Sequence, residues 1–268
     1  MNKKIGFIGC GKMASAIIKG VLTACCKPEV EIKGSEVNCE IAELAQNRLG
    51  IDVLTDNRLL AIDSDVIFIA TKPNYVTQVL EEIKGELTPE KLVVSIAAGV
   101  STKKIENILG QQRVIRVMPN TPALVKEGMS GICKGTYAVE EDAEFVMKLL
   151  SGIGKCIEVT EDQIDIVTAI SGSGPAFFYQ VIEDMARAGE KLGLDYEKSL
   201  LLAAQTALGS AKMVFERGEL TVQNLIDNVA TKGGCTFVGI QTMKEENSEK
   251  LFYDVIEKTA IKANELGK

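Results

Sequence analysis

The stretch Gly6-Phe-Ile-Gly9-Cys10-Gly11-Lys12-Met13-Ala14 decides the fold of the first half of this 268-residue chain. It follows a short apolar run, opens a helical pattern and places Gly-x-Gly-x-x-Ala at positions 9, 11 and 14. In such a turn the first glycine allows a tight bend, the second lets backbone amides approach a phosphate, and the small third residue keeps the helix close to the strand. Because the motif lies inside a strand–helix–strand unit, it predicts a site for a dinucleotide.

Short β-branched runs alternate with helical patterns from Lys4 to about Val159, which is typical of βαβ units and of a parallel sheet covered on both faces. We expect strands at KKIGFIG, VEIKG, IDVL, DVIFIA, KLVVSIA, RVIRVM, SGIC and KCIEV. We expect helices in KMASAIIKGVLTA, NCEIAELAQNRL, NYVTQVLEEIKG and STKKIENIL, with caps or turns at Asn38, Asn74, Ser101 and Gly110. The pattern predicts a doubly wound α/β sheet.

After Glu161 the strand-like runs vanish and helical periodicity continues to the C-terminus, so we expect two domains, residues 1–160 and 161–268. The segment Leu200–Phe215 carries one charge, Lys212, and a helix that is apolar all round must be buried on every side. A domain of this size can hardly bury it alone. We therefore expect a homodimer, or a higher assembly of such dimers, the alternative being a helix shielded by its own neighbours. The predicted fold is an N-terminal Rossmann-like domain followed by an all-α dimerisation domain.

Composition limits the partners of the chain. A formal charge of -7, 5% aromatic residues and no Trp argue against a nucleic-acid surface. No apolar run is long enough to span a membrane, and glycines and Lys12 interrupt what would be the apolar part of a signal peptide. We expect a cytoplasmic protein with neither nucleic acid nor membrane as partner.

Two residue counts restrict the chemistry. The seven cysteines, at positions 10, 25, 26, 39, 133, 156 and 235, form no C-x-x-C pair, so neither a disulfide framework nor a metal site is indicated. The chain has no histidine. That absence excludes Ser-His-Asp and Cys-His hydrolases, histidine-ligated zinc and dehydrogenases whose proton donor is an imidazole.

The second expected strand ends at Gly34-Ser35-Glu36, about 20 residues past the glycine motif, where the adenosine ribose of a dinucleotide should lie. An acidic group there ordinarily favours the 2′-hydroxyl of NAD, whereas a small hydroxyl such as that of Ser35 can host the 2′-phosphate of NADP. With Glu36 turned to solvent and no arginine beside it, both NADPH and NADH stay open.

Three further segments carry candidate site residues: Ala70–Pro73, Val114–Pro122 and Asp227–Thr236. The first two end strands at the carboxyl edge of the sheet, where ligands of open α/β sheets bind. Taken singly, each proline there is better explained as the end of a strand or the start of a helix than as part of a ligand site.

Together these blocks resemble the pyrroline-5-carboxylate reductases, the enzymes that make proline. GFIGCGKMASAI, ATKP, VVSIAAGV, VIRVMPNTPALVKEGM, SGSGPAF, GSAKMV and DNVATKGGCTFVGIQTM follow the order of that family and span nearly the whole chain. The last block, with its G-G-x-T core followed by Gly239 and Met243, is the most specific. The resemblance implies reduction of 1-pyrroline-5-carboxylate to L-proline by NADPH or NADH, the last step of proline biosynthesis.

The resemblance also implies particular contacts. For the cofactor these are Ile8, Gly9, Cys10, Gly11, Lys12, Met13, Ser35, Val37, Asn57, Ala70, Thr71, Lys72, Pro73, Ile96, Ala97, Ala98 and Asn228. For the substrate they are Glu161, Cys235 and Thr236. Two departures stand out, since Lys232 replaces a common Pro and Cys235 replaces a small residue such as Ala or Thr.

The chemistry of imine reduction suits a chain without histidine, because an imine nitrogen takes a proton from solvent or a weak donor near neutral pH. The protein must mainly hold the ring at near-attack distance from the nicotinamide. We expect Thr236 to donate a hydrogen bond, or relay a proton, to that nitrogen, and the amides of Gly233, Gly234 and Cys235 to bind the substrate carboxylate. The structural alternative for Thr236 is a helix N-cap.

Two other functions compete with this interpretation. A β-hydroxyacid dehydrogenase also begins with this kind of motif, but it needs a catalytic lysine in the first long helix of its second domain. The corresponding segment here, AFFYQVIEDMARAGEKLG, has no lysine before position 191. The other competitor is a non-catalytic NAD(P)H-binding redox sensor.

Overall fold

The computed structural model describes residues 3–23 and 30–267, and the chain divides into two compact units. The first unit extends to Ser173 and includes the C-terminal stretch from Thr259, whereas the second comprises Gly174–Lys258. The expected domain boundary near residue 160 marks a change of secondary-structure type, and it stays a prediction. Cys25 and Cys26 lie outside the described residues.

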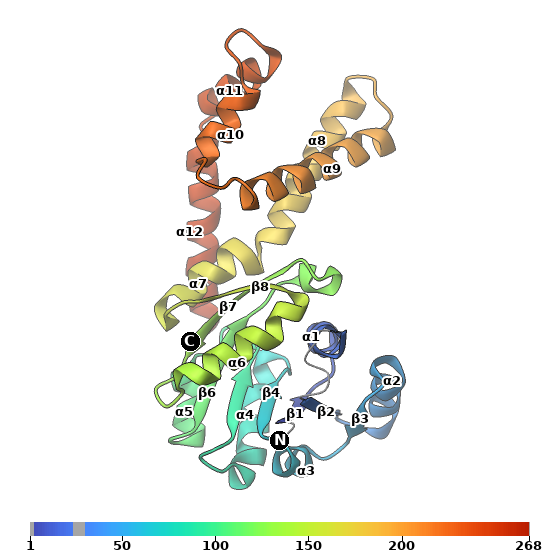
Figure 1. The fold of residues 1–268 in the computed structure, drawn as a ribbon, viewed down its shortest axis with the longest axis vertical. Coiled ribbons are helices and arrows are strands. Elements are labelled where there is room, and N and C mark those ends of the chain that lie inside the picture. The colour runs from blue at the N-terminus through green and yellow to red at the C-terminus, as the bar shows by residue number, and fades with distance from the viewer. Residues whose placement is uncertain (1–2, 24–29, 268) are drawn as a thin grey trace. The chain divides into compact units, whose positions relative to one another are not determined.

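The first unit is built on one sheet of eight strands, in the order β3-β2-β1-β4-β5-β6-β7-β8 (Figure 1). The strands are β1 (Lys3–Ile8), β2 (Val30–Ser35), β3 (Asp52–Leu54), β4 (Val66–Ile69), β5 (Leu92–Ser95), β6 (Arg113–Met118), β7 (Gly128–Lys134) and β8 (Gly154–Glu158). All eight expected strands are confirmed. The order reverses between β1 and β4, which makes the edge beyond the ends of these strands the usual ligand position of such a sheet.

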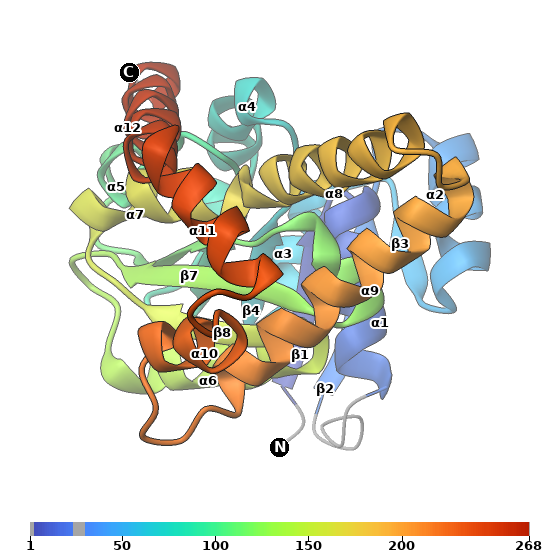
Figure 2. The same cartoon turned by 90° about the horizontal axis from the view of Figure 1, so that it is seen from above.

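One strand pair departs from the expected parallel arrangement, because β6 and β7 are antiparallel. The connection between them holds only a short 3-10 turn, Thr121–Val125. A parallel return needs a crossover of about a dozen residues or more, so this link sends β7 back along β6. The next connection contains helix α6 (Glu140–Leu150), and β8 again runs parallel to β7 at the end of the sheet (Figure 2).

Alternate residues of the central strands enter two separate cores, one on each face of the sheet. In β4, Val66 and Phe68 belong to one buried cluster and Ile67 and Ile69 to the other. Helices α1 (Lys12–Thr23) and α6 (Glu140–Leu150) supply the first cluster. Helices α3 (Asn57–Asp63), α4 (Pro73–Ile83) and α5 (Thr102–Leu109) supply the second. This double cover confirms the doubly wound fold and explains why the strands are almost wholly apolar.

The helix ends agree with the sequence prediction at three of four positions. Asn38 caps α2 (Cys39–Leu49), Ser101 caps α5, and Gly110 ends α5 with a φ of 75°. The expected cap at Asn74 is wrong, because α4 begins at Pro73 and its N-cap is Lys72, two residues earlier. Proline is favoured at that first position, since its fixed φ suits a helix and its missing N–H would be unpaired there anyway.

From residue 164 onward the chain is helical, as expected. Its helices are α7 (Ile164–Val167), α8 (Gly174–Lys191), α9 (Tyr196–Phe215), α10 (Val222–Val229), α11 (Cys235–Glu245) and α12 (Ser248–Gly267), with a π-helix at Thr168–Gly172. None of the described helices has the length and apolar character needed to cross a membrane.

Helix α9 leaves its apolar side chains uncovered within one chain. Only Ser199 and Ala203 are buried, whereas Leu201 and Phe215 keep 69% and 68% of their surface exposed. The alternative of a helix shielded by its own neighbours is therefore wrong. Exposed apolar surface of this kind marks an interaction site.

Candidate active site

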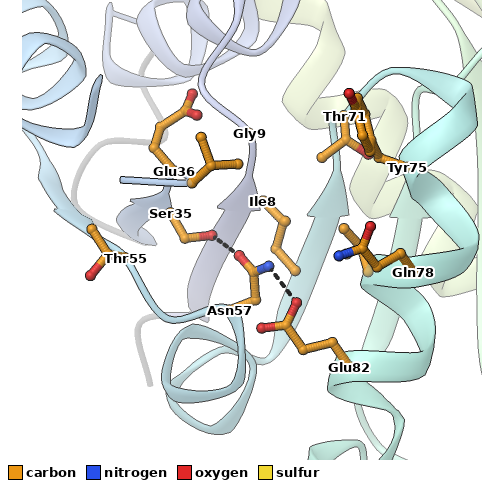
Figure 3. A pocket seen from close by; sticks show the side chains of 12 residues that line it. Ile8, Gly9, Ser35, Glu36, Thr55, Asn57, Thr71, Tyr75, Gln78 and Glu82 are labelled. Carbon is orange, nitrogen blue, oxygen red and sulfur yellow. Dashed lines mark hydrogen bonds between the residues drawn. The ribbon is translucent and has the colours of Figure 1, made fainter. Parts of the chain in front are cut away.

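The carboxyl ends of β1 and β2 border a cavity of about 360 Å³ (Figure 3). Helix α4, which follows β4, provides the opposite wall. The lining residues are Ile8, Gly9, Ser35, Glu36, Val37, Thr55, Asn57, Thr71, Tyr75, Gln78, Val79 and Glu82. Six of the residues expected at the cofactor, from four separate segments of the chain, are thus brought together.

The glycine-rich turn has the shape that the motif predicts. Gly9 has a φ of 92°, and a Cβ there would lie 3.0 Å from the carbonyl oxygen of Ala70. A Cβ at Gly11, in contrast, would meet no other described group within 4 Å. Packing within the chain therefore requires glycine at position 9, while the open space beside Gly11 suits the close approach of a phosphate.

Side chains hold this turn in place. The backbone N–H of Cys10 donates to Glu36 Oε1 at 2.7 Å, and the carbonyl of Cys10 accepts from Ser15 Oγ and Arg48 Nη2. The expectation that Glu36 turns to solvent is therefore wrong. Burial raises the pKa of the Cys10 thiol to about 12, so its sulfur stays protonated and acts as packing.

Thr71 is the clearest sign of a missing polar partner. Its Oγ1 is buried and finds no hydrogen-bond partner among the described residues, although the residue lines the cavity. A buried hydroxyl without a partner costs about 1–3 kcal/mol, which a ligand in the cavity could relieve. The orphaned hydroxyl and the open side of Gly11 fit a bound dinucleotide.

The far end of the cavity contains a directed chain of hydrogen bonds. Ser35 Oγ donates to Asn57 Oδ1 at 2.7 Å, and Asn57 Nδ2 donates to Glu82 Oε2 at 2.9 Å (Figure 3). The sequence analysis missed Glu82, together with Tyr75 and Gln78. Their spacing along α4 places them on one helical face directly after the Ala70–Pro73 segment, a signal that could have indicated them.

The other expected cofactor residues of the first unit lie at the same edge of the sheet without lining this cavity. They are Cys10 and Gly11 in the turn, Lys12 and Met13 at the start of α1, Ala70, Lys72 and Pro73 after β4, and Ile96, Ala97 and Ala98 after β5. Their individual contacts with a cofactor stay predictions.

Glu161, expected at the substrate, makes four polar contacts with three residues of the first unit. Its carboxylate accepts from the backbone N–H and Oγ1 of Thr102, at 3.1 and 2.7 Å, and from Cys133 Sγ at 3.4 Å. It also forms an ion pair with Arg116, whose side chain is only 6% exposed. Because a buried guanidinium needs a counter-charge, Glu161 has a structural role that sequence reasoning did not anticipate.

The loop that the sequence analysis expects to bind substrate lies in the second unit, at the start of α11. Gly233 has a φ of 81°, and Gly234 is the N-cap of the helix, with no side chain capping it. Thr236 is the second helical residue, so the alternative interpretation of Thr236 as the N-cap is wrong. The uncapped first turn keeps donors that can bind an anion such as a carboxylate.

Thr236 and Asn228 line one cavity of about 420 Å³ in the second unit. The remaining lining residues come from α9, α10 and α11, and they are Ser210, Met213, Val214, Val222, Leu225, Ile226, Val229 and Ile240. The structure thus brings together two residues that the sequence analysis assigned to substrate and cofactor. Within the described ranges no group of three or more His, Cys, Asp or Glu could hold a metal ion.

Comparison with known proteins shows what the chain as a whole is similar to. The model of the family "Pyrroline-5-carboxylate reductase dimerisation" matches residues 161–266, and that of "NADP oxidoreductase coenzyme F420-dependent" matches residues 4–99. A pyrroline-5-carboxylate reductase from Methanosarcina acetivorans is 41% identical, over 100% of this chain and 99% of its own.

Two solved structures have the same fold over their full length. A pyrroline-5-carboxylate reductase from Coxiella burnetii is 34% identical, with a TM-score of 0.94 and complete coverage of both chains. The Plasmodium falciparum pyrroline carboxylate reductase, solved with NADP bound, is 32% identical, with a TM-score of 0.85 over 100% of this chain and 99% of its own. The resemblance seen in the sequence is confirmed, and the chain belongs to the pyrroline-5-carboxylate reductase family.

Proposed function

We propose that this protein reduces 1-pyrroline-5-carboxylate to L-proline with NADPH or NADH, the last step of proline biosynthesis. The observation that carries the proposal is the cavity at the glycine-rich turn, with open space beside Gly11 and the orphaned hydroxyl of Thr71. Both features indicate a bound ligand, and the family of the chain identifies this ligand as a nicotinamide dinucleotide.

The reaction adds a hydride to the carbon of a C=N bond and a proton to its nitrogen. The bound nicotinamide cofactor supplies the hydride and its two electrons. The imine nitrogen is basic enough to be protonated near neutral pH, so the absence of histidine from this chain is no obstacle. The protein's contribution is to position the ring and exclude competing reactions.

Thr236 supplies the hydrogen bond to the imine nitrogen. Its position in the first turn of α11 lies beside the amides of Gly233, Gly234 and Cys235, which bind the substrate carboxylate. Cys235 forms a wall of the pocket, and Lys232 adds positive charge nearby. Glu161 contributes to substrate binding as well as to packing, and Asn228 belongs to the cofactor set.

The working form is a cytoplasmic homodimer, or an assembly of such dimers, and neither nucleic acid nor membrane is a partner. The support for self-association is the match to the dimerisation family and the uncovered apolar side chains of α9, among them Leu201, Leu202 and Leu208. Covering such side chains in a partner removes apolar surface from water, which drives obligate association.

Purified protein should oxidise NADH or NADPH when supplied with pyrroline-5-carboxylate and produce proline. Turnover with hydroxy acids alone would favour the β-hydroxyacid dehydrogenase alternative. Dinucleotide binding without turnover on either substrate would favour the non-catalytic redox sensor.

A further inference from the structure

The cofactor cavity contains two carboxylates at the end where a dinucleotide's adenosine ribose binds. Glu36 lies at the end of β2, and Glu82 enters from the opposite wall on α4 (Figure 3). Neither of them has a lysine or arginine partner among the ion pairs of the described residues. NADH and NADPH differ only at this ribose, where NADPH carries a phosphate with a charge of about -1.5 to -2 at neutral pH.

Glu82 sets the direction of the whole hydrogen-bond chain. An ionised carboxylate only accepts hydrogen bonds, so the amide nitrogen of Asn57 must face Glu82. The amide oxygen of Asn57 then faces Ser35, whose hydroxyl must donate its hydrogen to that oxygen. Ser35 is fully buried, so its one donor is consumed within the protein.

The hydroxyl hydrogen of Ser35 and one amide hydrogen of Asn57 are thus committed within this chain, and Glu82 adds an acceptor and a negative charge to the cavity wall. A 2′-hydroxyl can donate to a carboxylate, and it gains a charge-assisted hydrogen bond by doing so. A 2′-phosphate needs donors, and it would meet the like charges of Glu36 and Glu82 instead. Ser35, which the sequence suggested as a phosphate ligand, has no hydrogen to offer while Glu82 holds Asn57 in this orientation.

Two arginines contact residues around the cavity, but the guanidinium group of each donates to a backbone carbonyl. Arg58 Nε donates to the carbonyl oxygen of Glu82 at 3.1 Å, and Arg48 Nη2 donates to that of Cys10 at 2.5 Å. Neither is among the described residues that line the cavity.

We infer that Glu82 is a specificity-determining residue that makes this protein prefer NADH to NADPH. The inference rests on the proposed function, because it concerns the same dinucleotide site. It adds the identity of the cofactor and names the residue responsible.

The test measures binding by isothermal titration calorimetry, separately from turnover. The probes are NADH and NADPH, followed by adenosine 5′-monophosphate and adenosine 2′,5′-bisphosphate, which isolate the ribose end. The wild-type protein should bind NADH at least about tenfold more tightly than NADPH, the scale of one or two partly screened like charges. In Glu82→Gln the new amide can donate to Asn57, so the ratio of the NADPH dissociation constant to the NADH dissociation constant should fall about tenfold. The corresponding ratio for the two adenosine fragments should fall with it.

The matched control is Glu81→Gln, because Glu81 is the preceding residue of α4 and pairs with Lys84 outside the cavity. It should leave the ratio unchanged. Since both ligands are measured on one sample, partial loss of folded protein cancels in the ratio, and Glu82→Ala provides a second substitution that removes the charge.

Equal or tighter binding of NADPH by the wild type would overturn the inference, as would an unchanged ratio in both Glu82 variants. A wild-type preference for NADPH that Arg58→Ala abolishes would assign specificity to that cation instead. If neither dinucleotide binds, the proposed function fails together with the inference, whereas binding of both without discrimination removes the inference alone.

Discussion

Replacing Glu161 by alanine should destabilise the fold much more than an ordinary ion-pair substitution. The change leaves the guanidinium of Arg116, 6% exposed, without its counter-charge and removes the acceptor of two hydrogen bonds from Thr102. Breaking a buried ion pair from one side costs about 3–5 kcal/mol. Because the Glu161 side chain itself is 33% exposed, water can partly solvate the site. We therefore expect the free energy of unfolding to fall by about 3 kcal/mol, near the lower limit of this range.

Glu158→Ala is the matched control. Glu158 pairs with Lys134 at 3.0 Å, and its side chain is 30% exposed, close to the value for Glu161. Its lysine partner is 29% exposed, so water can replace the lost carboxylate, and the cost should stay below about 1 kcal/mol. The two variants therefore differ mainly in the burial of the cation.

The assay is urea unfolding followed by circular dichroism, because the chain has no Trp to serve as a fluorescent probe. All variants are compared at one protein concentration, since self-association shifts apparent stability. A loss in Glu161→Ala no greater than that in Glu158→Ala would refute the reasoning. Glu161→Gln keeps an acceptor for Thr102, so it should fall between the wild type and alanine. A rise in its KM for pyrroline-5-carboxylate would reveal the proposed part in substrate binding.

Three further outcomes are expected. Thr236→Ala should lower kcat by about 100-fold, the lower end of the usual contribution of a positioned proton donor, and should leave the dinucleotide affinity unchanged. Thr236→Ser keeps the hydroxyl and should retain most of the rate. An unchanged rate in the alanine variant would remove the catalytic assignment. Without cofactor, Gly11→Ala should have the melting temperature of the wild type, but it should bind NADH more weakly. Gly9→Ala should have a lower melting temperature, because of the two glycines only Gly9 has a positive φ and a close backbone neighbour. Equal melting temperatures of the two variants would contradict this. Hydrogen bonds from Lys33 and Lys4 lower the pKa of Asp63 below 3.8, so its stabilisation is present above that pH and is lost as the pH falls through the lower, folded-state value. The Asp63→Asn variant should therefore be less stable than the wild type at neutral pH by less than about 1 kcal/mol, with the gap closing in acid, and a gap that persists below pH 2 in urea titrations would oppose this account.

Several features of the fold were predictable because neighbouring residues encode them. The apolar runs of β1 and β4 identify buried strands without reference to the rest of the chain. The requirement for glycine at position 9 also arises locally, from a bend that other residues rarely adopt. Local patterns failed at the start of α4, where Lys72 rather than the expected Asn74 is the cap, and the alternative interpretation of Thr236 as an N-cap was also wrong, because Gly234 caps α11. Several residues in each stretch could begin a helix, and packing selects one of them.

The direction of β7 could not be predicted from its composition. An apolar strand has the same pattern in either orientation, so the length of the connection from β6 decides the pairing. The uncovered surface of α9 shows the opposite case. Its apolar sequence predicts burial on all sides, but Leu201 and Phe215 are exposed in one chain. This exposure is consistent with a second copy of the chain packing on α9.

The sequence by itself determined the strand set, the dinucleotide motif and the family, because each is carried by residues adjacent along the chain. Only the tertiary structure decided which distant side chains meet. It joined Glu161 to Thr102 across 59 positions, and it directed the hydrogens of Ser35 and Asn57 toward Glu82. Such contacts depend on the meeting of strand ends and helix faces, and neither spacing nor composition encodes where those will lie.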